Sequence, residues 1–301
     1  MLTGDCSHLP YSRGEAMRLT RETAERAEKM SFDPTHPETL RLRHLLGSPI
    51  LQWPPSRPLH DPRGVASAVS FTCWKKASAS RVGIAGSYFS HKAGGRTACH
   101  SFLEAKLLRY FEMCPFVVEI RTQYPAWNRA DFLKYCEKGK RMPRNKIMTV
   151  DFMLTLRIPG YPFALYHGVS GKPSSLLEEE PVIARHRREA NSLNEWGSTH
   201  EPMTENTVTN VECINYRRML SYMLHTDDIG RHAVVAADLA RALKATNAHG
   251  SLDRVLCMVA RRLGWDRRLG YRLFGIANFL GYLSWNHQYE LHPRYPMKLG
   301  E

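Results

Sequence analysis

Three side chains of complementary chemistry stand where a β-hairpin would bring them together. Asp151 opens the β-prone run DFMLTLR, a Pro-Gly turn follows, and the second run, FALYHGVSGKP, passes Lys172 at its end. If the turn centres near Gly160, Asp151 lies opposite Val169 or Ser170, and cross-strand neighbours sit about 5 Å apart. Ser170 and Lys172 are two residues apart and therefore share a face of the strand. The spacing predicts an acid, a hydroxyl and an ammonium group in one small space.

An earlier helix can add a second carboxylate. The stretch SFLEAKLLRYFEM has apolar residues at helical spacing and ends before Pro115, and it carries Glu104 in its first turn. Two carboxylates beside a lysine suit metal-dependent phosphodiester hydrolysis. Mg²⁺ prefers carboxylate oxygens, and a lysine offsets charge in the transition state.

Each of these residues also has an ordinary structural explanation. S-x-x-E is a helix capping box, which by itself accounts for Glu104. Asp151 can merely begin a strand, and Lys172 can be a solvated strand end. On spacing alone, short motifs of this kind favour the structural explanation.

A longer sequence pattern favours a functional explanation for these residues. The segment YFSHKAGGRTACHSFLEAKLLRYFEMCPFVVEIRTQYPAW and the later pieces TVDF and GKP follow in order over residues 85–215. This pattern resembles the catalytic domain of TnsA, the endonuclease subunit of heteromeric cut-and-paste transposases. The resemblance implies an α/β fold, with a restriction-endonuclease-like (PD-(D/E)xK) mixed-sheet catalytic domain and a C-terminal, winged-helix-like helical domain.

The resemblance also implies the roles of the site residues. Glu104 and Asp151 would hold two Mg²⁺ ions, for which Mn²⁺ can substitute, beside Lys172. Ser170 stands where well-known members of the family have a glutamine ligand, so we expect it to be a catalytic and metal-binding residue through its short hydroxyl or the strand carbonyl. Glu189 falls where the family has a further helix glutamate, and we expect it to be a weaker candidate.

The implied activity is cutting of the 5′ (non-transferred) strands at transposon ends. The implied partners are DNA, a TnsB-like transposase that cuts and joins the 3′ ends, and a TnsC-like AAA+ ATPase. Two alternatives stay open. One is a stand-alone restriction or repair nuclease, and the other is a non-catalytic DNA-binding assembly protein on a nuclease scaffold.

The charge of the chain is compatible with a polyanionic partner. Lys and Arg number 42 against 29 Asp and Glu, a formal net charge of +13. The basic clusters predict DNA contacts at His91, Lys92, Arg96, Arg267, Arg268 and Arg272.

The composition and the pattern of apolar residues along the chain predict three regions. Residues 1–65 read as an arm with one helix-like stretch and a Pro-rich part, residues 66–210 as the catalytic domain, and residues 211–301 as the C-terminal domain. The last region has four helical stretches, followed by an alternating run around Asn286-His287 that predicts a β-hairpin wing. With no apolar membrane span or secretory leader and seven scattered cysteines, we expect a cytoplasmic protein without membrane contact.

Overall fold

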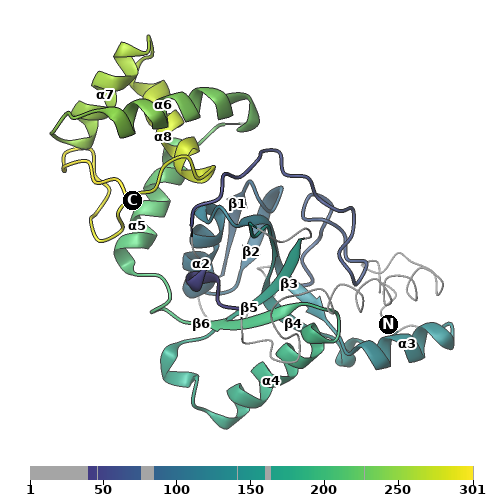
Figure 1. Cartoon of the computed structure of the whole chain (residues 1–301). Helices are drawn as coiled ribbons and strands as arrows, with labels where there is room; N and C mark the ends of the chain where they lie inside the picture. The colour runs from purple at the N-terminus through teal and green to yellow at the C-terminus, as the bar shows by residue number, and fades with distance from the viewer. Residues whose placement is uncertain are drawn as a thin grey trace. The chain divides into compact units, whose positions relative to one another are not determined.

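A mixed sheet of four strands organises the first part of the computed structural model (Figure 1). The structure describes residues 40–45, 47–75, 85–140, 142–159, 164–226 and 228–300. The helix expected over residues 14–30 and the tip of the central hairpin lie outside the described residues. The chain divides into two compact units. Unit 1 is built mainly from Arg57–Ala105 and Val117–Thr207, and unit 2 from Gly47–Ser56, Lys106–Phe116 and Val208–Glu301.

The strands of the main sheet lie in the order β3-β4-β5-β6. Their bounds are Val117–Ala126 for β3, Met148–Leu156 for β4, Leu165–Gly171 for β5 and Thr199–Met203 for β6. β3, β4 and β5 pair antiparallel, whereas β6 runs parallel to β5. A parallel neighbour needs a crossover connection, and helix α4 (Glu180–Asn194) supplies it. The sequence predicted the β4–β5 hairpin, but not β6, whose sequence THEPM contains a proline.

Smaller elements complete unit 1. A two-stranded hairpin pairs β1 (Gly86–Ser90) with β2 (Gly95–Cys99). Helix α3 (Arg129–Glu137) interrupts the stretch that the sequence presented only as polar and basic, and the Asn128 side chain caps its first turn. The core of this unit contains aromatic and aliphatic side chains from β3, β4 and α4, among them Tyr124, and from the residues just after β3 and α4, among them Trp127 and Trp196.

Helix α2 (Phe102–Met113) begins in unit 1 and continues into unit 2. Unit 2 otherwise consists mainly of helices. They are α5 (Asn210–Tyr222), the short 3-10 turn η5 (Gly230–His232), α6 (Ala233–Ala245), α7 (Leu252–Arg262) and α8 (Arg267–Phe279). The four helical stretches expected after residue 210 are therefore present.

The predicted hairpin around Asn286-His287 is wrong as a strand pair. The turn exists, since the Tyr289 N–H donates to the Asn286 carbonyl at 3.0 Å. However, Trp285 bridges to Leu299, much farther along the chain, and no strand is assigned over residues 281–300. The alternation of apolar residues there reflects burial of loop side chains: Leu283, Trp285 and Leu291 are all buried.

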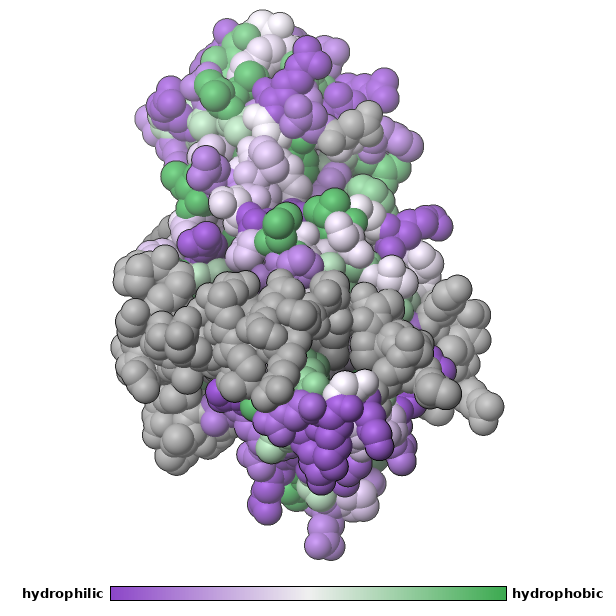
Figure 2. Space-filling model, turned by 90° about the vertical axis from the view of Figure 1, so that its right-hand side faces the viewer, coloured by the Kyte–Doolittle hydropathy of each residue, from purple (hydrophilic) through white to green (hydrophobic). Residues whose placement is uncertain are grey.

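The surface seen in Figure 2 combines hydrophilic and apolar residues. In the view of Figure 2, the coloured surface is mainly hydrophilic, and its apolar residues form small separate groups. None of the helices in the described ranges is both long and apolar enough to cross a membrane.

Candidate active site

Glu104 is held at the start of α2 by the helix cap and by the sheet. Its N–H donates to the Ser101 hydroxyl at 3.1 Å, and that hydroxyl lies 3.2 Å from Glu104 Oε1. Oε2 accepts from the His100 N–H at 2.8 Å and from Gln123 Nε2, on β3, at 3.2 Å. The side chain is only 6% exposed, and this burial raises the pKa of Glu104 despite the hydrogen bonds. Ser101 therefore caps α2 as expected, but the Glu104 carboxylate accepts from the N–H of His100 and not from that of Ser101, and it also contacts β3.

Asp151 lies on β4 at the place that the hairpin geometry predicted. The β4–β5 register pairs Phe152 with Val169, which puts Asp151 opposite Ser170. Its Oδ2 accepts from the Gly171 N–H at 2.8 Å. Burial raises the pKa of Asp151 to about 6, the negative charge of Glu104 adds to this effect, and the Gly171 hydrogen bond opposes it.

Lys172 completes a group of three charged side chains. It follows β5, where its main-chain N–H donates to the Met203 carbonyl of β6 at 2.9 Å. The positive charge of Lys172 lowers the pKa of both Glu104 and Asp151, against the larger effect of burial. The charges of Glu104 and Lys172 therefore both act on the carboxylate of Asp151.

Ser170 belongs to a second group, in which it contacts side chains of α4 and β6. Its hydroxyl donates to Glu189 Oε2, on α4, at 2.7 Å and lies 3.2 Å from His200 Nε2, on β6. Arg185 Nε donates to Glu189 Oε1 at 2.7 Å. Burial raises the pKa of Glu189, but the hydrogen bond from His200 and the charge of Arg185 outweigh it and lower that pKa to about 2. Ser170 is therefore engaged with an ionised, fully buried Glu189, whose charge in turn raises the pKa of Asp151.

Sequence reasoning missed several members of this arrangement. Gln123 has a φ of 48°, a left-handed conformation that non-glycine residues rarely adopt, and its side chain binds Glu104. The run VVEIRTQY read as an uninterrupted strand, and no local signal marked this position. His200 was also missed, because it meets Glu189 only through the fold. Arg185 was missed although its i,i+4 spacing to Glu189 on one helix is a local signal.

The donor set fits a hard divalent cation. Two buried carboxylates with raised pKa values, Glu104 and Asp151, leave a negative charge that such a cation would neutralise. Within the described residues, no three His, Cys, Asp or Glu side chains are arranged to hold a metal ion. Mg²⁺ is usually bound through one or two carboxylates, with water and substrate phosphate oxygens as its other ligands. The two carboxylates thus suit a Mg²⁺ ion whose other ligands are water and substrate phosphate oxygens. They are too few for a site made entirely of side chains.

The basic loop predicted to contact DNA is the turn of the β1–β2 hairpin. Arg96 is exposed, and His91 is half-buried with its ring 4.9 Å from that of Phe89. Lys92 is fully buried, and its carbonyl accepts from the Ile120 N–H at 3.2 Å. The predicted DNA contact through Lys92 is therefore corrected, because its ammonium group does not reach the surface.

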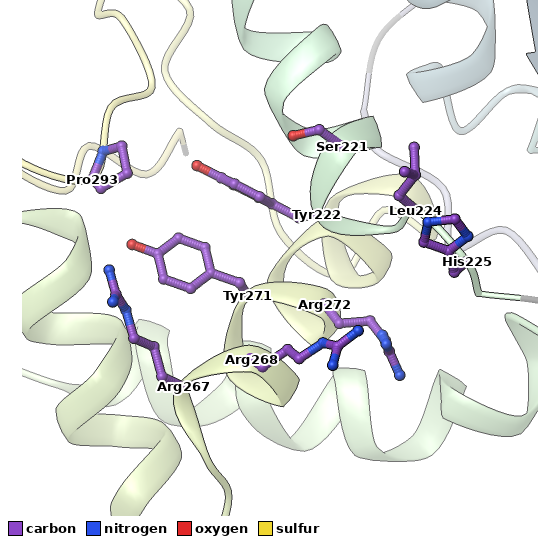
Figure 3. A pocket seen from close by; sticks show the side chains of 9 residues that line it. All are labelled: Ser221, Tyr222, Leu224, His225, Arg267, Arg268, Tyr271, Arg272 and Pro293. Carbon is purple, nitrogen blue, oxygen red and sulfur yellow. The ribbon is translucent and has the colours of Figure 1, made fainter.

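The other predicted DNA contacts line a pocket of unit 2 (Figure 3). This pocket has a volume of about 620 Å³, and α8 contributes Arg267, Arg268, Arg272 and Tyr271 to its wall. Tyr222, from the end of α5, meets Tyr271 edge-to-face with ring centroids 4.8 Å apart. The guanidinium group of Arg267 lies 5.8 Å from the Tyr271 ring centroid. The pocket combines positive charge with two aromatic rings.

Comparison with models of known protein families and with curated proteins gives no match to this chain.

Proposed function

We propose that this protein is a metal-dependent DNA endonuclease of the TnsA type, which cuts the 5′ strands at the ends of a mobile element. One observation carries the proposal. Glu104, bound by Gln123 of β3, and Asp151, which accepts from the Gly171 N–H of β5, both have pKa values that burial raises and the charge of Lys172 lowers. A helix and an adjacent β-hairpin supply these groups, in the chain order of the PD-(D/E)xK nucleases.

The side chains have distinct roles in this proposal. Glu104 and Asp151 would hold Mg²⁺ or Mn²⁺. When bound, the ion supplies a hydroxide nucleophile and neutralises charge on the phosphate. Lys172 offsets the negative charge that develops on the phosphate oxygens or orients the attacking water. Gln123 fixes the carboxylate of Glu104 through its 3.2 Å hydrogen bond.

Ser170 takes a different role from the one that the sequence suggested. Its hydroxyl hydrogen bond goes to Glu189, so we propose that it positions Glu189 and does not bind a metal through its side chain. The main-chain carbonyl of Ser170 stays a candidate ligand.

The finer fold assignment is part of the same proposal. The mixed sheet of unit 1, with Asp151 on β4 and Lys172 after β5, suits a restriction-endonuclease-like domain. In unit 2, Ser251, just before α7, bridges Pro296, and Trp285, after α8, bridges Leu299. This order of three helices and three short extended segments is that of a winged helix, with the chain between Trp285 and Pro296 as the wing.

In a winged helix, α8 would be the helix that enters a DNA groove. Its three arginines then become candidates for phosphate or base contacts. The TnsB-like and TnsC-like partners rest on the sequence resemblance alone, and the +13 net charge supports only the DNA.

Strand-specific cleavage tests the function. DNA carrying the element ends is incubated with Mg²⁺ or Mn²⁺, the cognate transposase and the ATPase, and cuts are mapped on each strand. Asp151→Ala should abolish the 5′ cuts and spare the 3′ cuts. Asp131→Ala, which removes an exposed carboxylate of α3, should cut like the wild type.

Two other outcomes would favour the alternatives. Sequence-specific cleavage by the chain without partners would favour a stand-alone nuclease. Retention of both sets of cuts by Asp151→Ala would favour a non-catalytic assembly protein.

A further inference from the structure

A basic groove runs along unit 1 between the start of β4 and the exposed side of α4. It has a volume of about 740 Å³, and we call it the β4–α4 groove. Four cationic side chains line it: Lys75, Lys146, Arg185 and Arg188. Polar amide and hydroxyl groups, including those of Asn191 and Ser192, supply much of the remaining wall.

The groove adjoins the candidate active site through two of its lining residues. Thr149 precedes Asp151 by two positions on β4, so both side chains are on the same face of the strand. Arg185 Nη2 donates to the Thr149 carbonyl at 3.3 Å, and its Nε donates to Glu189 at 2.7 Å. A ligand lying in the groove would therefore pass close to Asp151.

The charge of the groove is predominantly positive. Glu195 is the single acidic residue among the described residues that line it, and it already accepts hydrogen bonds from Asn128 Nδ2 at 2.6 Å and from the Arg129 N–H at 2.7 Å. Of the cations, Lys146 has an ion pair with Asp131 at 3.3 Å, and both partners are substantially exposed. Such exposed pairs are weak, so the ammonium group can exchange its partner at little cost.

Two further observations indicate the kind of ligand. The Ser192 hydroxyl is buried and has no hydrogen-bond partner among the described residues, although Ser192 lines the groove. None of the described residues that line the groove is aromatic. Proteins that bind single strands stack bases on aromatic rings, whereas duplex backbones are bound by cations, amides and hydroxyls.

We propose that the β4–α4 groove binds the sugar-phosphate backbone of duplex DNA next to the scissile phosphate. This inference rests on the proposed nuclease function and deepens it. Arg188 and Lys75 contact phosphates from the open side of the groove, while Arg185 links the bound backbone to Glu189. The contacts fix the position of the duplex and carry no base specificity.

The helix α4 offers a matched pair of variants for the test. Arg187 and Arg188 are adjacent and both exposed, but only Arg188 lines the groove. Binding of the full chain to a short fluorescent duplex is titrated over a range of salt concentrations. Ca²⁺ replaces Mg²⁺ so that the DNA stays intact. Thermal melting of both variants checks that they fold like the wild type.

Loss of one phosphate contact lowers the slope of log K against log salt by about 0.9. A decrease of this size corresponds to about fivefold weaker binding of the duplex at about 0.15 M salt. Arg188→Ala should show both changes on duplexes of unrelated sequence, and Arg187→Ala should show neither. Equal binding and equal slopes for the two variants would contradict the proposal that the β4–α4 groove binds DNA.

The two proposals can fail separately. If DNA binding depends on Arg188 but no cleavage occurs with any partner, the DNA-binding role of the groove is supported and the proposed nuclease function is wrong. If the strand-specific cuts occur but Arg188→Ala and Arg187→Ala bind DNA alike, the nuclease function is supported and the proposed DNA-binding role of the groove is wrong.

Discussion

Replacing Asp151 by asparagine should stabilise the metal-free protein. The folded-state pKa of Asp151 is about 6 against an ordinary value of 3.8, because the carboxylate is buried near Glu104. A raised acid pKa means that the ionised group is less favourable in the folded state than in the unfolded chain. The penalty is absent below about pH 3.8, grows as the pH rises, and is complete above about pH 6. The difference corresponds to about 3 kcal/mol.

Asparagine removes the charge but keeps an oxygen that can accept the Gly171 N–H. In EDTA, urea denaturation of Asp151→Asn should therefore show an unfolding free energy about 2–3 kcal/mol above that of the wild type near pH 8. The gap should close near pH 4. Asp131→Asn, which removes an exposed carboxylate 3.3 Å from Lys146, should change stability by less than about 1 kcal/mol at either pH. A destabilised Asp151→Asn variant, or a gap that does not change with pH, would refute the reasoning.

Three further variants test other parts of the structure. Ser170→Ala removes a hydrogen bond to the buried Glu189, so denaturation should show a loss of about 1–3 kcal/mol, and metal-dependent cleavage should slow without vanishing. Gln123→Gly relieves the left-handed backbone but frees Glu104; stability should change by no more than about 1 kcal/mol while cleavage falls, as parallel melting and cleavage assays can establish. Gly275→Ala would put a Cβ 2.8 Å from a main-chain carbonyl oxygen of α5, so melting should show a loss of about 1–3 kcal/mol.

Local sequence was sufficient for the elements that carry the candidate site. The apolar spacing and cap of SFLEAKLLRYFEM predicted α2, and the assumption of a turn centred near Gly160 predicted the register of the β4–β5 hairpin. That register put Asp151 opposite Ser170, as observed. These features depend on neighbours in sequence, because caps and turns act over a few residues.

The surroundings of the site could not be predicted in the same way. Ser170, Glu189 and His200 come from β5, α4 and β6, and only the parallel crossover brings them together. Local sequence therefore does not give the partner of the Ser170 hydroxyl, which is Glu189. The left-handed Gln123 is likewise maintained by its long-range contacts and not by its own sequence.

The error at the C-terminus has a similar cause. Leu283, Trp285, Tyr289 and Leu291 alternate as a hairpin would, but the bridging partner of Trp285 is Leu299. Burial of loop side chains produced the same pattern as a strand. Helix α3, in contrast, had a local signal that was overlooked, since the Asn128 side chain accepts from the Asp131 N–H at 3.0 Å in a standard N-cap.

Metal binding tests the central claim most directly, since it needs neither DNA nor partner proteins. Titration of the full chain with Mn²⁺ near pH 8, followed by electron paramagnetic resonance, counts bound ions in the wild type and in Asp151→Asn. We expect saturable binding by the wild type, its loss in Asp151→Asn, and wild-type binding by Asp131→Asn. Equal Mn²⁺ binding by the wild type and Asp151→Asn would contradict the assignment of this site.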